Sequence, residues 1–450
     1  MMTLFNANQI DRISDLPSNV IDVILGNLRI RDQVRTSILS TKWRYMWTSA
    51  PHLYFDDDFY QRFLVLDDPG AVVSKIITDV VMLHNGPIHK FSICIYADFD
   101  FKITTEDINL WIPFMSRDVK HLELVTHCVF KDPMPDILFS CKELTYFKCS
   151  SFILSIPPNF CGFEKLLELH LVCVEFESSA LESLMSGCPF LEKLVIELCG
   201  DFEYLDISSP TLKVLLVKLE YDIKSICLKK AKNLVDFTLD ANYNSLSGLI
   251  KSLPKIKRFS MLRGKKIPLA DIIPPTLLTS SFSSLEYLKL DEFNLKERGE
   301  LLYIVSVLKS APRLIELTIR QVNMNIPMLL GLFLVLVYFD TSIFILQSDN
   351  NVDTIQVLDH SEELECSSWG GLKLQTVNIE VEARSQHAMS LIKLILANSP
   401  LLKTLTFNYS SEKLGAVMLF RISQDLLLMK RASPRAQVKF LCSTFPPFVW

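Results

Sequence analysis

The sequence predicts a mixed α/β chain, built as a long stack of helix, turn and strand units behind a head of three short N-terminal helices. Two observations lead to this prediction. A six-residue apolar pattern recurs eleven times between Val119 and Phe407, and the first 55 residues hold apolar side chains at helical spacing. With 450 residues, 49% of them hydrophobic and 22% charged, the chain can bury the core that such a stack needs.

Residues 16–50 are expected to form the three helices of the head. Pro17 suits the first turn of a helix, and apolar residues at spacings of one, three and four follow it as far as Leu28. A second helix is expected over residues 31–40 and a third over residues 41–50. Three helices of this length enclose too little volume to bury all their apolar side chains. The head is therefore expected to bind a partner.

Trp43 and Trp47 stand four residues apart in the third predicted helix, in a chain with only five tryptophans. An α-helix would place both rings on one face. Tryptophan buries a large area and is frequent at binding hot spots, so the two rings are expected to fill part of the head's core and to form part of a partner-facing surface. The alternative is that both rings serve only the local core.

The recurring pattern is an apolar residue, two variable residues, an apolar residue, one variable residue and a last apolar residue. Its alternating end favours a short strand, because every second side chain of a strand lies on one face. A proline often precedes the pattern and ends an upstream helix. The pattern begins at Val119, Leu144, Leu166, Leu191, Leu212, Leu234, Ile256, Leu285, Leu314, Leu374 and Leu402.

The pattern starts are 21 to 29 residues apart, except for one gap of 60 between Leu314 and Leu374. This is the period of leucine-rich repeats, whose units bury their apolar faces only when they stack. Helical spacing upstream of the strands, as in residues 178–189 and 299–312, completes the unit. A solenoid with parallel strands on its concave, macromolecule-binding side is therefore expected. The alternative is two ordinary α/β domains in which the pattern recurs by chance.

The head resembles an F-box, the helical module that docks on the Skp adaptor of cullin-RING (SCF) ubiquitin ligases. The resemblance rests on "LP" at residues 16–17, "VIDVIL" at residues 20–25 and "VRTSILSTKWRYMW" at residues 34–47, a form common in plant F-box proteins. The residues that it implies as adaptor contacts are Leu16, Pro17, Val20, Ile21, Ile24, Leu25, Leu28, Val34, Leu39, Trp43 and Trp47.

The whole chain is similar to the plant F-box, leucine-rich repeat and FBD family, whose closing domain contains a strand, a helix and a "RASPxAxV"-like ending. Here that ending is "RASPRAQVKF". The resemblance implies a non-catalytic subunit that recognises a target protein of unknown identity, and that binds a Skp-type adaptor and through it cullin. The expected domains are an F-box at 10–55, a linker with first repeat-like elements at 56–110, leucine-rich repeats at 111–365, an FBD-like segment with the last repeats at 366–442, and a tail at 443–450.

Composition and motifs argue against several other functions. A net charge of −5 and a pI near 6.0 give no field to attract nucleic acid or an acidic membrane. No nucleotide-binding, metalloprotease or hydrolase motif occurs, so no cofactor, metal or catalytic residue is expected. His121, His127 and Cys128 flank a predicted strand without a second ligand cluster, which favours ordinary core or surface roles. The alternative function is a repeat scaffold that uses its head for self-association.

Eleven cysteines occur singly, and the N-terminus lacks a basic region followed by an apolar run. An intracellular protein of the cytoplasm, the nucleus or both is therefore expected. The very apolar residues 326–347 disturb the repeat period. Three interpretations stay open for them: a helix and strand of a degenerate repeat, a membrane anchor, against which Pro327 and Asp340 count, or a segment from an alternative or wrongly joined exon.

Overall fold

The structure is a computed structural model, and the statements below concern the residues that it describes. These are residues 13–95, 103–126, 131–177, 179–200, 203–243, 253, 256–263, 282–293, 295, 298–321, 371–381, 385–409, 416–442 and 445–449. The apolar segment at 326–347 lies outside them. The chain divides into two compact units: unit 1 is Met1–Tyr221 with Cys227–Leu234, and unit 2 is Asp222–Ile226 with Val235–Trp450.

Unit 1 begins with the helical head. Its elements are the α-helices α1 (Ser18–Gly26) and α2 (Ile30–Arg35) and the 3-10 helices η1 (Thr36–Ile38) and η2 (Trp43–Ser49). Glycine at the end of α1 allows a close approach to the first strand, because a Cβ added to Gly26 would lie 2.9 Å from Nδ1 of His52. The head therefore packs directly against the start of the repeat sheet.

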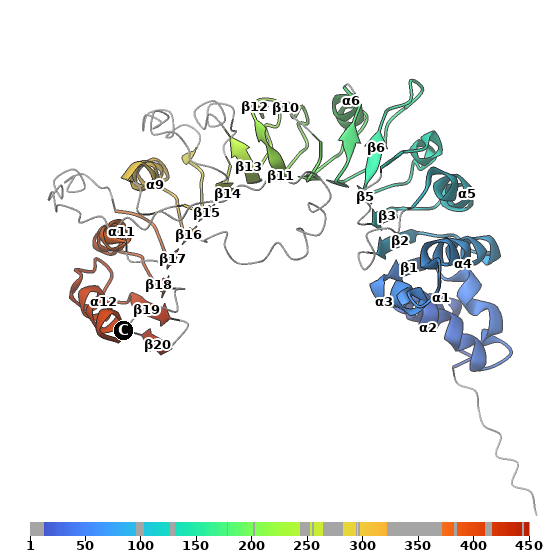
Figure 1. Ribbon diagram of the computed structural model, residues 1–450, viewed down its shortest axis with the longest axis horizontal. Coiled ribbons are helices and arrows are strands. Elements are labelled where there is room, and N and C mark those ends of the chain that lie inside the picture. Colours follow the sequence, from blue (N-terminus) through green and yellow to red (C-terminus); the bar gives the residue numbers. More distant parts are fainter. Residues whose placement is uncertain are drawn as a thin grey trace, which may run out of the picture. The chain divides into compact units, whose positions relative to one another are not determined.

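The sheet of unit 1 is parallel, and Figure 1 shows its three longer helices on one side of the strands. In order across the sheet its strands are β1 (His52–Asp56), β2 (Lys90–Ile95), β3 (His121–Thr126), β5 (Tyr146–Ser150), β7 (Glu168–Val172), β9 (Lys193–Glu197) and β11 (Val214–Ile223). The three helices are α4 (Pro69–Leu83), α5 (Thr105–Met115) and α6 (Ala180–Ser186).

Shorter elements fill the connections of unit 1. They are the helices α3 (Asp57–Tyr60), η3 (Gln61–Phe63) and η4 (Asp136–Ser140), and the strands β4 (Asp132–Pro133), β6 (Phe152–Leu154), β8 (Glu175–Phe176) and β10 (Tyr204–Asp206). Strand β12 (Ser225–Cys227) falls where the chain divides, with Ser225 and Ile226 in unit 2. Strands β4, β6 and β8 pair as a second, small parallel sheet.

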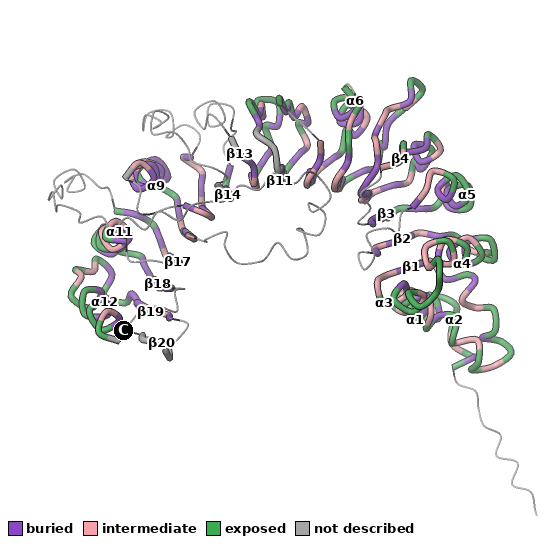
Figure 2. The backbone as a smooth tube through the Cα atoms, in the orientation of Figure 1, coloured by how far each residue is buried: buried purple, intermediate pink, exposed green. Residues whose placement is uncertain are grey.

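Every second side chain of a repeat strand is buried against the helices. In β7, Leu169 and Leu171 are fully buried, whereas Glu168, His170 and Val172 on the opposite side are partly exposed. Figure 2 shows the same mixture of buried and intermediate residues along the other strands of unit 1. We call the side turned away from the helices the strand face.

The sheet of unit 2 is also parallel except at its last strand. In order its strands are β13 (Asp236–Tyr243), β14 (Arg258–Arg263), β15 (Tyr287–Asp291), β16 (Glu316–Arg320), β17 (Thr376–Val381), β18 (Thr404–Tyr409), β19 (Gln437–Cys442) and the antiparallel β20 (Phe445–Val449). Figure 1 shows α9 (Arg298–Ser310), α11 (Gln386–Asn398) and α12 (Ala416–Leu428) on one side of these strands.

All eleven strands that the apolar pattern predicts are confirmed, and each begins two residues after its pattern starts. The helices expected within residues 178–189 and 299–312 are α6 and α9. The same pattern also begins at Ala50 and Ile88, where β1 and β2 form, so the repeat sheet begins before the first of the eleven patterns. The expected domain limits stay predictions.

Among the described helices, none has the length and apolar character needed to cross a bilayer. Strand β20 occupies most of the tail at 443–450, for which the sequence offered no assignment. In the FBD-like segment, strands β17, β18 and β19 alternate with α11 and α12, and each strand pairs in parallel with the one before it. The segment therefore continues the sheet of unit 2.

Candidate functional site

A small core holds the head together. Ile21 and Leu25 of α1 pack with Trp43 and Ala50, and none of the four is more than 7% exposed. The side chains that pack against this core while partly buried are Leu16, Leu28 and Met46. Trp43 is 1% exposed, so its ring fills the head's interior and does not face solvent.

The expectation that Trp43 and Trp47 share one face of an α-helix is wrong. Residues 43–49 form a 3-10 helix, in which side chains three residues apart lie on the same face. Met46 therefore accompanies Trp43 to the core, and Trp47 lies elsewhere on the helix and is partly buried. The indole N–H of Trp43 is buried, with no hydrogen-bond partner among the described residues.

Seven large apolar side chains of the head stay exposed. On α1, Val23 is 64% exposed, and Val20 and Ile24 are each 37% exposed. Their spacings of three and four place them on one side of the helix. The other four are Val34 (39% exposed), Ile38 (87%), Leu39 (55%) and Tyr45 (68%). We call these seven residues the head patch, and so many exposed large apolar side chains in so short a stretch of chain are typical of a protein-binding region.

The structure divides the eleven predicted adaptor contacts into groups. The exposed ones are Pro17, Val20, Ile24, Val34 and Leu39. The core ones are Ile21, Leu25 and Trp43, and the partly buried ones are Leu16, Leu28 and Trp47. Adaptor contact by any of them stays a prediction. Val23, Ile38 and Tyr45 are exposed as well and were not among the predicted contacts, although helical spacing relates Val23 to Val20 and Ile38 to Val34.

Gln33 joins the head to the repeat sheet. Its side chain is fully buried, and Nε2 donates to the carbonyl oxygens of Leu25 (2.9 Å), Leu28 (3.0 Å) and His52 (2.8 Å). The preceding carbonyl, that of Pro51, accepts hydrogen bonds from the backbone leading into β2. Because successive carbonyls of a strand point to opposite sides, the His52 carbonyl faces the outer edge of the sheet, where Gln33 satisfies it.

Charged groups reinforce this junction. The Arg29 guanidinium lies 3.1 Å from the carboxylate of Asp56 and also pairs with Asp58. Asp56 ends β1, and its side chain accepts a hydrogen bond from the backbone N–H of Phe59 at 3.0 Å, which caps α3. The loop after α1 is thereby tied to the segment that follows the first strand.

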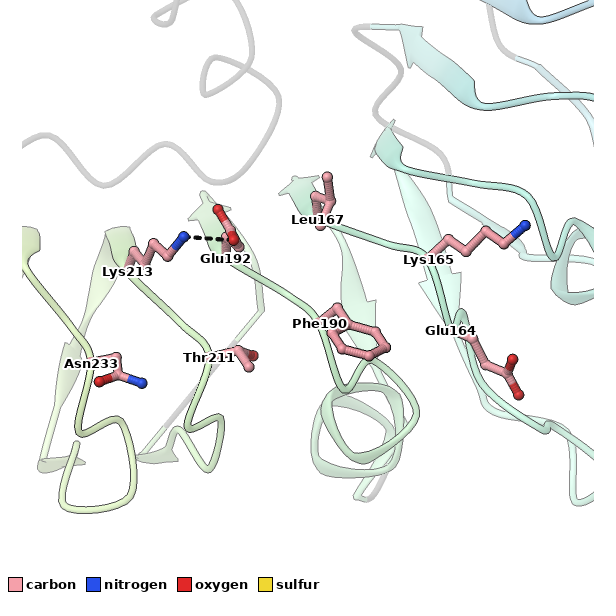
Figure 3. A pocket seen from close by; sticks show the side chains of 8 residues that line it. All are labelled: Glu164, Lys165, Leu167, Phe190, Glu192, Thr211, Lys213 and Asn233. Atoms are coloured by element: carbon pink, nitrogen blue, oxygen red, sulfur yellow. Dashed lines mark hydrogen bonds and ion pairs between the residues drawn. The ribbon is translucent and has the colours of Figure 1, made fainter.

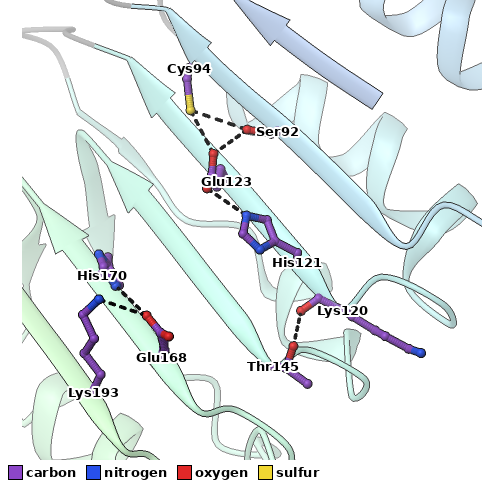
Figure 4. Close-up of polar contacts among 9 residues, drawn as sticks. All are labelled: Ser92, Cys94, Lys120, His121, Glu123, Thr145, Glu168, His170 and Lys193. Carbon is purple, nitrogen blue, oxygen red and sulfur yellow. Dashed lines mark hydrogen bonds and ion pairs between the residues drawn. The ribbon is translucent and has the colours of Figure 1, made fainter. Parts of the chain in front are cut away.

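The strand face of unit 1 carries a connected polar network, which Figure 4 shows. Glu123 on β3 accepts hydrogen bonds from His121 Nε2 at 2.8 Å, from the Ser92 hydroxyl and from the Cys94 thiol at 3.1 Å. Burial opposes ionisation of Glu123, but the three hydrogen bonds outweigh it and hold the pKa of this carboxyl well below its usual value. Glu123 is therefore an ionised group with both oxygens engaged.

Three aromatic rings cross the strand face beside this network. His121 and Tyr146 are stacked with ring centroids 4.1 Å apart, and Tyr146 and His170 follow at 5.1 Å. Glu168 accepts from Lys193 Nζ at 3.1 Å and contacts His170 Nε2 at 3.4 Å. Burial and the charge of Lys193 lower the pKa of His170 despite the carboxylate of Glu168 beside it.

A shallow recess lies where β7, β9 and β11 begin, with a volume of about 430 Å³. Figure 3 shows Phe190 and Leu167 beside the ion pair of Lys213 and Glu192, whose charged atoms are 2.6 Å apart. Phe190 is 58% exposed and Leu167 42% exposed. Such a mixture of apolar and charged groups is typical of surfaces that contact proteins.

The histidines and cysteines of the described ranges form no cluster, with each other or with acidic side chains, that could hold a metal ion. His121 is engaged with Glu123 and Tyr146, and His127 and Cys128 lie outside the described residues. The nine described cysteines are all free thiols. Cys149 is buried in β5, where it takes the place of an apolar strand residue.

The fold and the exposed head together define a protein-binding molecule, an F-box followed by leucine-rich repeats. Residues 13–53 match the family model of the F-box domain. Residues 110–319 match the model described as "FBD-associated F-box protein At5g56370, LRR repeats".

Relatives from Arabidopsis thaliana extend this similarity over nearly the whole chain. The F-box/FBD/LRR-repeat protein At1g13570 is 30% identical over 96% of this chain and 98% of its own length. The putative F-box/FBD/LRR-repeat protein At1g66290 is 26% identical over 96% and 94%, and the putative FBD-associated F-box protein At3g50710 is 29% identical over 56% and 65%. The chain belongs to the F-box/FBD/LRR-repeat family.

Proposed function

We propose that this chain is the substrate-recognition subunit of an SCF-type ubiquitin ligase. Its F-box binds a Skp-type adaptor and through it cullin, and its repeat and FBD region binds a target protein. The chain itself contributes no catalytic group. It promotes ubiquitin transfer by holding a target lysine near the loaded enzyme, which raises their effective concentration. The free thiols favour a reducing setting, in the cytoplasm, the nucleus or both.

The observation that carries this proposal is the head patch. The head buries Ile21, Leu25 and Trp43 in its own core and still leaves seven large apolar side chains exposed. Complete burial of one such side chain in an interface contributes about 1.5–3 kcal/mol. A partner that covers Ile38 and Leu39 alone therefore gains enough free energy to change affinity about a hundredfold or more.

The first experiment captures the full chain on an immobilised Skp adaptor and compares it with the double variant Ile38→Ser, Leu39→Ser. Both side chains are more than half exposed, so the variant is expected to fold normally and to lose adaptor affinity about a hundredfold. The matched control is Leu428→Ser on α12, which removes an 85% exposed leucine from unit 2 and is expected to leave capture unchanged.

Substitution of Trp43 is a poor test of binding, because loss of a buried ring empties the head's core and unfolds the surface indirectly. Undiminished capture of the double variant would refute the assignment of the head patch as the adaptor surface. If the wild-type chain instead formed oligomers that the double variant lost, and captured no adaptor, the self-associating scaffold would be the correct function.

A further inference from the structure

Lys148 lies at the centre of the strand face of unit 1 without an acidic partner. The register of β3, β5 and β7 places it between Glu123 and His170. Both oxygens of Glu123 are engaged by other donors, and Lys148 makes no ion pair or side-chain hydrogen bond among the described residues. Burial lowers the pKa of His170 most, the charge of Lys193 lowers it next, and the charge of Lys148 lowers it further. The Lys148 ammonium group therefore acts electrostatically on His170.

The carboxylates and the lysines of this face differ in whether they have a partner. Each carboxylate on β1 to β7 has a partner: Asp56 pairs with Arg29, Glu123 accepts three hydrogen bonds, and Glu168 pairs with Lys193. Lys90 on β2, like Lys148, has no carboxylate within ion-pair distance in the part of the chain that the structure describes. The carboxylate oxygens of these strands are therefore engaged by other groups, whereas Lys148 and Lys90 have no carboxylate within ion-pair distance among the described residues.

The aromatic rings strengthen the attraction between the Lys148 ammonium group and an anion. The rings of His121 and His170 lie against the ring of Tyr146, and the two histidine side chains are only 27% and 15% exposed. The three rings therefore displace water beside Lys148. Removal of water lowers the effective dielectric constant and strengthens the attraction between opposite charges. Two strand spacings, about 10 Å, separate the strands of Lys90 and Lys148, a distance that one extended peptide covers.

We propose that this face binds an extended, acidic segment of the target, with carboxylates of the segment pairing with Lys148 and Lys90 across the strip of rings. This inference rests on the proposed function, because it names the chemistry of the target that the repeat region takes. It assigns specificity to the strands β2 to β7, which lie within unit 1.

The test uses the full chain and two fluorescent peptides of equal length, one alternating glutamate with serine and one alternating lysine with serine. The wild-type chain is expected to bind the glutamate peptide more tightly, with an affinity that falls as salt is added. Lys148→Glu is expected to weaken this binding at least about tenfold. Lys75→Glu is the matched control: it makes the same charge change at an exposed position on α4, on the helix side of the sheet, and is expected to change binding less than about twofold.

Equal binding of the two peptides, or an undiminished affinity in Lys148→Glu, would overturn the proposal. A loss in Lys75→Glu as large as in Lys148→Glu would also overturn it, because the binding would then respond to any added negative charge on the chain and not to the charge at position 148. Adaptor capture by the same preparations separates this inference from the ligase proposal. Lys148→Glu is expected to bind the Skp adaptor as the wild type does, and a wild-type chain that binds the glutamate peptide but no adaptor would refute only the ligase assignment.

Discussion

Replacement of Gln33 by leucine tests whether one buried side chain joins the head to the repeat sheet. Leucine keeps a similar volume and removes the amide group, so the packing of the site is largely retained. The carbonyl oxygens of Leu25, Leu28 and His52 then lose the donor that they share. The substitution thus isolates the hydrogen bonds from the shape of the side chain.

The magnitude follows from the geometry of the site. Two N–H hydrogens serve three carbonyl oxygens, and each net hydrogen bond contributes about 0.5–1.5 kcal/mol. The Leu25 carbonyl keeps a hydrogen bond from the backbone N–H of Leu28, and each of the other two carbonyls, left without this donor, adds a penalty of about 1–3 kcal/mol. Against these costs, the variant removes the Gln33 Oε1 atom, which is buried without a partner in the described part of the chain. We expect a net loss of about 3 kcal/mol in the local stability of the head.

Hydrogen exchange measured by mass spectrometry is the suitable assay, because a chain of two units need not unfold in one step. A loss of about 3 kcal/mol raises the exchange rate of α1 and β1 about a hundredfold where local opening controls exchange. The matched control is Gln424→Leu on the exposed side of α12, which should leave the exchange of the head unchanged. Exchange in α1 and β1 that rises no more in Gln33→Leu than in the control would refute this account of the junction.

Three further predictions follow from other sites. Trp43→Ala should lower the stability of the head by about 3–5 kcal/mol, because it removes a fully buried ring, and should abolish the protection of α1 in hydrogen exchange. The pKa of His170 is lowered, so the folded chain binds a proton at this ring less readily than the unfolded chain does. Stability is therefore expected to fall as the pH drops below about 6.5. His170→Gln should flatten the decline of the thermal midpoint between about pH 7 and 5. In the native chain Cys161 is exposed and should react rapidly with iodoacetamide, whereas Cys149, whose pKa burial raises, should react only after unfolding, as peptide mapping will show.

Each of these predictions has an outcome that would contradict it. Unchanged protection of α1 in Trp43→Ala would show that the remaining core residues suffice. A thermal midpoint of His170→Gln that declines with acid as steeply as that of the wild type would assign the acid sensitivity to other groups, such as His84, whose pKa burial also lowers. Equal labelling rates of Cys161 and Cys149 would mean that β5 opens readily.

The repeat strands could be predicted from the sequence because their signal is simple. Each strand needs only alternating apolar side chains, and the pattern at Leu166, for example, places Leu169 and Leu171 in the core. Stacking the units repeats this requirement at a regular interval. The same pattern starts at Ala50 and Ile88 and contains β1 and β2, so the repeat signal begins directly after the head.

The division of the head into core and surface could not be predicted in the same way. On α1 the exposed Val20 and Ile24 stand directly before the buried Ile21 and Leu25, so apolar character alone does not separate the two faces. In η2 the choice of a 3-10 helix over an α-helix decides which side chain accompanies Trp43, and that choice depends on contacts with the rest of the head. Helical spacing indicates an apolar region, and only packing shows which part of it remains exposed.

The charges of the strand face show a second limit. Glu123 and Lys148 are register neighbours on adjacent strands, so the sequence and the sheet together favour an ion pair between them. The structure shows Glu123 turned to His121, Ser92 and Cys94 instead, because these groups together offer three donors to its two oxygens. Lys148, which an ion pair with Glu123 would have neutralised, therefore remains available to a binding partner.

The two ends of the repeat sheets indicate where a partner can bind. At the outer edge of β1 the His52 carbonyl is satisfied by Gln33. At the other terminal edge, β20 pairs with β19 in the antiparallel sense and carries Pro446 and Pro447, which lack the N–H donors that a further strand would need. A target that added a strand beside β1 would have to displace Gln33, and one that added a strand beside β20 would find no N–H donor at either proline. Binding through side chains of the strand face requires no such displacement, and for that reason specificity is expected to depend on residues such as Lys148 rather than on backbone pairing.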